Sequence, residues 1–77
     1  MPHVIVKMYT GRSEEMKRNL VDEITKAIVK SLGVNESSIS VALEEIEPDK
    51  WSETVYKPDI LGKENLLYKE PGYTPDM

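Results

Sequence analysis

The chain has 77 residues, of which 10 are basic and 14 acidic, and it contains no cysteine. The missing cysteines exclude a disulfide framework and a thiolate metal site. A net charge of −4, with both signs mixed along the chain, disfavours nucleic acid as a partner. No apolar run approaches the ~20 residues of a membrane span, and the first residues do not resemble a signal peptide. We therefore expect a single cytoplasmic domain over residues 1–77.

The first predicted element is a strand from Pro2 to Tyr9. Its β-branched and apolar residues alternate with more polar ones, which places Val4, Val6 and Met8 on one face. Proline lacks a backbone N–H and is tolerated at the first residue of a strand. Pro2 therefore has a purely structural explanation.

A glycine turn and an amphipathic helix follow. Ser13 is the predicted N-cap, and Glu14 and Glu15 lie in the first turn, where the helix dipole favours negative charge. The helix should end near residues 31–33, because Gly33 can adopt the left-handed conformation of a C-cap. Apolar residues at spacings of three and four predict its buried stripe: Met16, Leu20, Ile24, Ala27, Ile28 and Leu32.

Residues 37–46, "SSISVALEEI", alternate again and predict a second strand. Strand, long helix and strand form a βαβ unit, with parallel strands and a right-handed crossover helix. The predicted fold class is therefore α/β (α+β) with a single βαβ unit. After Pro48 the periodicity fails, although "PDKW" fits one helical turn. Pro58 and Gly62 predict breaks, so we expect a short irregular C-terminal segment.

This architecture leaves one face of the predicted sheet without a partner. One helix covers one face, whereas parallel sheets are nearly always covered on both, and two strands alone are marginal. A chain of this length buries only about 60% of the surface that it exposes when unfolded. We therefore expect symmetric self-association.

The order of the motifs resembles the 4-oxalocrotonate tautomerase family, within the tautomerase superfamily. "MP" and a strand are followed by "GRSEEMK", a crossover helix ending in "SLG", the strand "SSISVALEEI" and then Trp51. The resemblance covers roughly the first fifty residues. "MPH", "SSIS", the later Pro and Trp, and "PGY" near the C-terminus are similar to its phenylpyruvate-tautomerase-like subgroup.

The resemblance implies a cofactor-free keto–enol tautomerase. In this family Met1 is removed, and the nitrogen of Pro2 acts as a general base. Arg12 matches an arginine that orients a substrate carboxylate, and Trp51 matches an aromatic wall. Members that act on dicarboxylates carry a second arginine where this chain has Ser40, which implies a monocarboxylate 2-oxo acid such as phenylpyruvate, with Ser40 as a candidate hydrogen-bond donor. The subgroup also implies a homodimer, and disfavours a hexamer.

Elementary chemistry makes Pro2 a reasonable base in its own right. An α-amino group has a pKa of about 7.7–8.0 and is mostly protonated at pH 7. Burial against Trp51 and a nearby Arg12 would both disfavour the cation and bring the amine toward the optimum for general base catalysis. Each residue also has a structural explanation: Arg12 as a solvated turn residue and Trp51 as a core or interface anchor. His3, with no partner at ligand spacing, is expected in strand packing or in solvent and not on a metal.

Two functional alternatives stay open. A chain that retains Met1 has an amide at Pro2 with no basic lone pair, which would make it a non-catalytic oligomeric binding protein on the same scaffold. A protonated Pro2 could instead act as an acid in hydration or dehalogenation. That chemistry needs a carboxylate to activate water, and Glu44, Glu45 and Glu47 are the candidates.

Overall fold

A computed structural model describes residues 1–74 of the chain. Residues 75–77, the end of the predicted domain over 1–77 and of its predicted irregular tail, lie outside the described residues. The chain divides into two compact units, an N-terminal unit, Met1–Glu45, and a C-terminal unit that begins at Ile46. That the 77 residues act as one domain stays a prediction.

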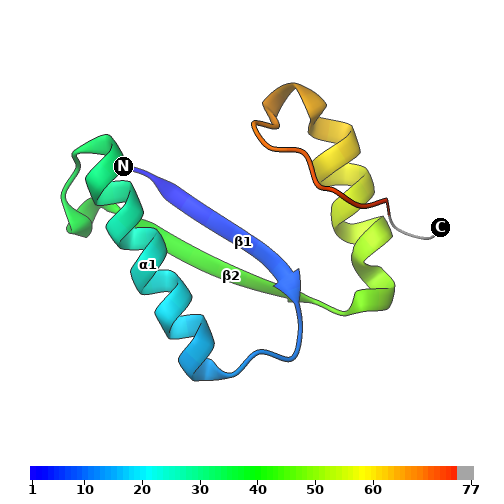
Figure 1. Ribbon diagram of the computed structural model, residues 1–77, viewed down its shortest axis with the longest axis horizontal. Coiled ribbons are helices and arrows are strands. Elements are labelled where there is room, and N and C mark those ends of the chain that lie inside the picture. Colours follow the sequence, from blue (N-terminus) through cyan, green and yellow to red (C-terminus); the bar gives the residue numbers. More distant parts are fainter. Residues whose placement is uncertain (75–77) are drawn as a thin grey trace. The chain divides into compact units, whose positions relative to one another are not determined.

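The N-terminal unit contains the predicted strand, helix and strand. Strand β1 (His3–Tyr9) leads into helix α1 (Glu14–Leu32), and a short 3₁₀ helix, η1 (Glu36–Ser38), precedes strand β2 (Ser40–Ile46). The two strands pair in one sheet and run in the same direction (Figure 1). The predicted βαβ unit with parallel strands is therefore confirmed.

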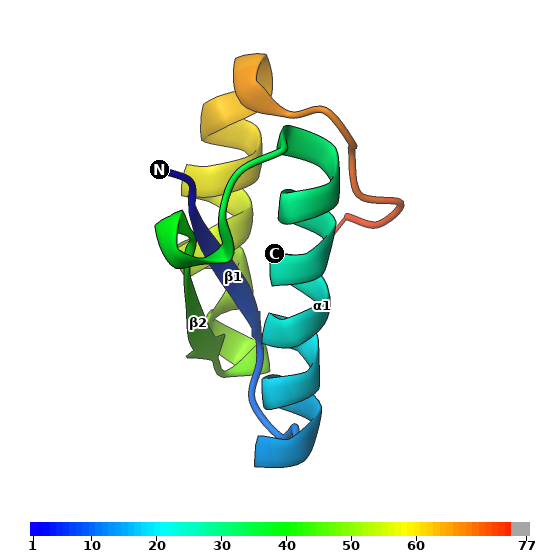
Figure 2. The same cartoon turned by 90° about the vertical axis from the view of Figure 1, so that its left-hand side faces the viewer.

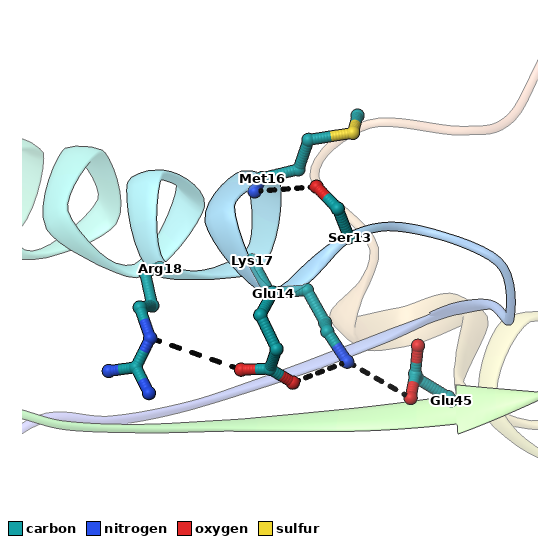
Figure 3. Close-up of polar contacts among 6 residues, drawn as sticks. All are labelled: Ser13, Glu14, Met16, Lys17, Arg18 and Glu45. Atoms are coloured by element: carbon teal, nitrogen blue, oxygen red, sulfur yellow. Dashed lines mark hydrogen bonds and ion pairs between the residues drawn. The ribbon is translucent and has the colours of Figure 1, made fainter.

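Local signals set both ends of α1. The Ser13 hydroxyl accepts a hydrogen bond from the backbone N–H of Met16 at 3.1 Å (Figure 3), so Ser13 is the N-cap. At the other end Gly33 has φ +69°, and its N–H donates to the carbonyl of Val29 at 3.0 Å. Only glycine adopts this conformation without a steric penalty, which explains why the helix ends here.

Replacing Ser13 by Ala should lower the free energy of unfolding by about 1 kcal/mol, because the N–H of Met16 loses its acceptor. The measurement is urea unfolding at fixed protein concentration. Ser37→Ala is the matched control, because this exposed serine makes no side-chain hydrogen bond within residues 1–74. Equal stability of the two variants would contradict the capping role.

Helix α1 lies along one face of the sheet (Figure 2). Its half-buried side chains form one stripe along the helix: Lys17, Leu20, Val21, Ile24, Thr25 and Ile28. Met16 and Leu32 are 58% and 63% exposed and Ala27 is also exposed, so their predicted place in the buried stripe was wrong. Met16 and Ala27 lie on the flank of the covered stripe, and Leu32 is the last helical residue.

The opposite face of the sheet carries exposed apolar side chains. Ile5 is 50% exposed and Tyr9 44% exposed, and alternation along β1 places both on the face away from α1. His3 and Ser40, which bond to each other across the strands, share this face. No other element of the N-terminal unit covers it, so a second layer there would add apolar burial.

The C-terminal unit is largely helical. A 3₁₀ turn, η2 (Pro48–Lys50), leads into a π-helix, η3 (Ser52–Ile60), and a second 3₁₀ segment, η4 (Leu61–Leu66). Its buried residues are Ile46, Val55 and Tyr56. Within residues 1–74, none of the helices combines the length and the apolar character needed to cross a bilayer.

The predicted break at Pro58 was wrong, because Pro58 lies inside η3. A proline ring holds φ near −65°, which is itself a helical value, although the ring removes one N–H donor and crowds the carbonyl of the preceding turn. At Gly62 a Cβ atom would lie 3.1 Å from the carbonyl oxygen of Lys57, so the glycine permits a close backbone approach. The irregular backbone comes one residue later, at Lys63 (φ −130°, ψ 36°). From Leu67 to Thr74 the chain has no regular element, as expected for its end.

Candidate active site

Pro2 lies directly before β1 and is half-buried. Its carbonyl oxygen accepts a hydrogen bond from the backbone N–H of Ser40 at 3.1 Å, so the first parallel pairing of the sheet holds it. Met1, by contrast, has a fully exposed side chain. While Met1 is attached, the nitrogen of Pro2 is a tertiary amide, which has neither a proton to donate nor a basic lone pair.

Ser40 brings a second side chain to this end of the sheet. Its Oγ lies 2.6 Å from Nδ1 of His3, across the two strands. Sequence reasoning placed His3 in packing or solvent and missed this pair. Alternation puts His3 and Ser40 on the same outward face, and the parallel register then brings them level.

Arg12 lies in the turn between β1 and α1, where it is exposed. Its Nη1 donates to the carbonyl oxygen of Tyr9 at 3.1 Å. The seven residues of β1 separate Arg12 from Pro2, which at 3.3 Å per residue corresponds to about 23 Å. The structure therefore does not bring Pro2 and Arg12 of one chain together, although the sequence predicted both for one site.

Trp51 belongs to the C-terminal unit, at the junction of η2 and η3, and is half-buried. Its indole Nε1 donates a hydrogen bond to the hydroxyl of Tyr73 at 2.8 Å. The ring of Tyr73 lies 5.8 Å from that of buried Tyr56, centroid to centroid, at an interplanar angle of 52°. The sequence pattern did not indicate this contact, because 22 residues separate Trp51 from Tyr73.

Two of the three carboxylates considered for water activation, Glu44 and Glu45, lie away from Pro2 in the same chain, and the third, Glu47, belongs to the C-terminal unit. Glu44 and Glu45 follow Ser40 by four and five residues along β2, which corresponds to about 13 and 17 Å of strand. Glu45 also accepts from Nζ of Lys17 at 3.4 Å. This arrangement gives no support within one chain to hydration chemistry at Pro2.

Lys17 pairs with two carboxylates, Glu14 on its own helix and Glu45 on β2, and the second pair joins the helix to the sheet. Its Nζ lies 3.0 Å from Glu14 and 3.4 Å from Glu45 (Figure 3). The hydrogen bond between Lys17 and Glu14 lowers the pKa of Glu14 below its ordinary value and raises the pKa of Lys17. A groove of about 620 Å³ between α1 and β2 is lined by these residues and not by Pro2 or Arg12. We assign the cluster to helix docking.

The chain as a whole is similar to known proteins. Residues 2–53 match the family described as tautomerase enzyme. The chain is 41% identical over 73 residues to a probable tautomerase of Xylella fastidiosa, covering 95% of this chain and 89% of the relative. It is 40% identical over 74 residues to tautomerase PptA of Cronobacter sakazakii, covering 95% and 97% of the two chains.

A solved structure is similar to this chain in both fold and sequence. The crystal structure of YwhB, a homologue of 4-oxalocrotonate tautomerase, superposes with a TM-score of 0.61 at 46% identity. The match covers 62% of this chain and 79% of that one. The likeness in fold and the likeness in sequence therefore point to the same family.

Proposed function

The chain belongs to the tautomerase family of enzymes, and from this we propose that it interconverts the enol and keto forms of a 2-oxo acid such as phenylpyruvate, without a cofactor. Pro2 is the proposed general base, with Met1 removed. One observation supports this role most directly. The Pro2 carbonyl is held by Ser40 at 3.1 Å while Met1 is fully exposed, so cleavage before Pro2 costs the fold no contact of the Met1 side chain.

The proposed reaction moves one proton and leaves the enzyme unchanged. The neutral amine of Pro2 takes the proton of the enol hydroxyl, and the C=O bond forms as the C=C electrons move to the neighbouring carbon. That carbon then takes a proton from the Pro2 ammonium, which regenerates the neutral amine. Pro2 is a catalytic residue in this scheme because its nitrogen contacts both reacting atoms.

We propose Arg12 as the residue that binds the substrate carboxylate. Its guanidinium has five N–H donors, of which the contact with the Tyr9 carbonyl uses one. The length of β1 separates it from Pro2 of the same chain. The proposed site therefore takes Pro2 from one chain and Arg12 of the partner subunit.

A cytoplasmic homodimer fits this requirement. A two-fold axis that runs β1 antiparallel to its copy brings opposite strand ends together, which places Arg12 of the partner subunit at Pro2. The exposed face that carries Ile5 and Tyr9 supports such an association. The shortness of the chain and its single helix per sheet argue in the same direction.

Ser40 and Trp51 complete the proposed substrate-binding residues. If Nδ1 of His3 carries the proton and donates to Oγ of Ser40, the Ser40 hydroxyl stays available to donate to substrate. Trp51 keeps part of its indole accessible, and such an aromatic surface suits an apolar substrate side chain.

The test begins with intact mass, which shows whether Met1 is absent from the chain isolated from its native host. The Met1-free chain should convert enol phenylpyruvate to the ketone faster than buffer does, as followed by ultraviolet absorbance. A chain that retains Met1 should be inactive. Full retention of Met1 in the native host would instead favour a non-catalytic binding protein.

The substrate carboxylate offers a further prediction. The methyl ester of enol phenylpyruvate should be processed with a kcat/KM about 10- to 100-fold lower than the acid, because the charge-assisted hydrogen bond to Arg12 is lost. Steady-state kinetics on both compounds measure this ratio. Arg12→Ala should treat acid and ester alike, and a ratio unchanged by that substitution would remove Arg12 from the carboxylate site.

A further inference from the structure

Three aromatic residues of the C-terminal unit form a connected series. Tyr56 is only 8% exposed and belongs to the core of the unit, on η3. Tyr73 packs its ring against Tyr56 with centroids 5.8 Å apart. The Tyr73 hydroxyl in turn accepts the hydrogen bond from Nε1 of Trp51 at 2.8 Å. Tyr73 therefore connects a buried anchor to a partly accessible indole.

The two contacts of Tyr73 have different consequences. A tilted ring pair with a buried partner limits where the Tyr73 ring can lie. An indole N–H is a donor only, and one directed acceptor selects one orientation of the ring about its side-chain torsions. Residues 67–74 have no regular structure of their own, and Tyr73 is the residue of this segment that contacts both Tyr56 and Trp51.

We propose that Tyr73 is a positioning residue for substrate binding, which holds the Trp51 indole in the orientation that contacts the substrate. This inference depends on the proposed function, since it takes Trp51 as a substrate-binding residue. Tyr73 acts through Trp51 and has no role in proton transfer. The segment after η4 thereby influences affinity for the substrate and not the chemical step.

Tyr73→Phe tests this directly, because it removes the hydroxyl and keeps the ring against Tyr56. Tyr68→Phe is the matched control, since Tyr68 lies in the same segment, is fully exposed and makes no side-chain contact among residues 1–74. Trp51 is the chain's one tryptophan. Its fluorescence anisotropy therefore reports the indole alone, independently of activity.

The expected result for Tyr73→Phe is a lower anisotropy and a KM for enol phenylpyruvate raised about three- to tenfold, the range that loss of one hydrogen bond gives. The kcat should stay within about twofold, because binding weakens equally in ground and transition states. Tyr68→Phe should change neither quantity. A merely structural role would lower the melting temperature without separating KM from kcat.

A second variant tests the same hydrogen bond from its donor, Trp51. Trp51→Phe removes the same hydrogen bond from the donor side, so adding Tyr73→Phe to it should change KM no further. An unchanged KM or unchanged anisotropy in Tyr73→Phe would overturn the proposal, as would additive effects in the double variant. If wild type and Tyr68→Phe were both inactive on enol phenylpyruvate, the proposed function itself would fail. Activity with an unaltered KM would contradict only the role of Tyr73.

Discussion

Pro2→Ala lowers kcat for phenylpyruvate ketonisation by about 10²- to 10⁴-fold, which is the usual contribution of a positioned general base. Alanine leaves a primary amine at the N-terminus, but that amine lacks the ring that fixes the direction of the nitrogen lone pair. We expect the reduction to fall on kcat more than on KM, because Pro2 acts in the transition state. Steady-state kinetics of Met1-free protein provide the measurement.

Acetylation of the wild-type N-terminus is the matched control for Pro2→Ala. It keeps the proline ring and the hydrogen bond from Ser40 to the Pro2 carbonyl, but it converts the amine to an amide. Both proteins should unfold at the temperature of the wild type, since the nitrogen of Pro2 donates to no strand. A Pro2→Ala chain that retained the wild-type rate would exclude Pro2 as the base.

Mixing two impaired variants should restore activity. Pro2→Ala lacks the base, and Arg12→Ala lacks the carboxylate ligand, with an expected 10- to 100-fold loss in kcat/KM. If each site joins Pro2 of one chain to Arg12 of the partner subunit, a mixed dimer contains one site with both residues. After subunit exchange at equal concentrations, about a quarter of the wild-type activity should return, because half of the dimers are mixed.

The control for this mixture pairs Pro2→Ala with a chain that carries both substitutions. No arrangement of those two chains contains an intact site, so their activity should stay at the level of the separate variants. Recovery in the first mixture and not in the second identifies a site shared between chains. If the first mixture regained nothing although exchange was verified by mass, Pro2 and Arg12 would not meet across subunits.

The local parts of the fold were predictable because single residues decide them. Ser13 and Gly33 mark the ends of α1 through one hydrogen bond and one backbone angle, and both signals are visible in the chain. Pro58 misled the prediction, because its preference against helix interiors is an average that tertiary packing around Val55 and Tyr56 overrides.

The sequence predicts a set of candidate site residues but not their geometry. Pro2 and Arg12 are candidates from their motifs, and the strand that separates them was predicted to within one residue of β1, but the motifs gave no indication that its length keeps the two apart within one chain. The His3–Ser40 and Trp51–Tyr73 contacts join residues 37 and 22 positions apart. Periodicity reports which face a residue occupies, and it says nothing about which distant residue shares that face.

The hydrogen bond from Ser40 to the Pro2 carbonyl has a consequence for conformational entropy. A histidine or glutamate that serves as a base must lose rotamer freedom each time it takes its working position. The nitrogen of Pro2 belongs to a ring and to the main chain, and the neighbouring carbonyl is already held in the sheet ladder. The proposed base would therefore have no side-chain torsion left to restrict, and once Met1 is removed the strand pairing that folds the protein would also orient its lone pair.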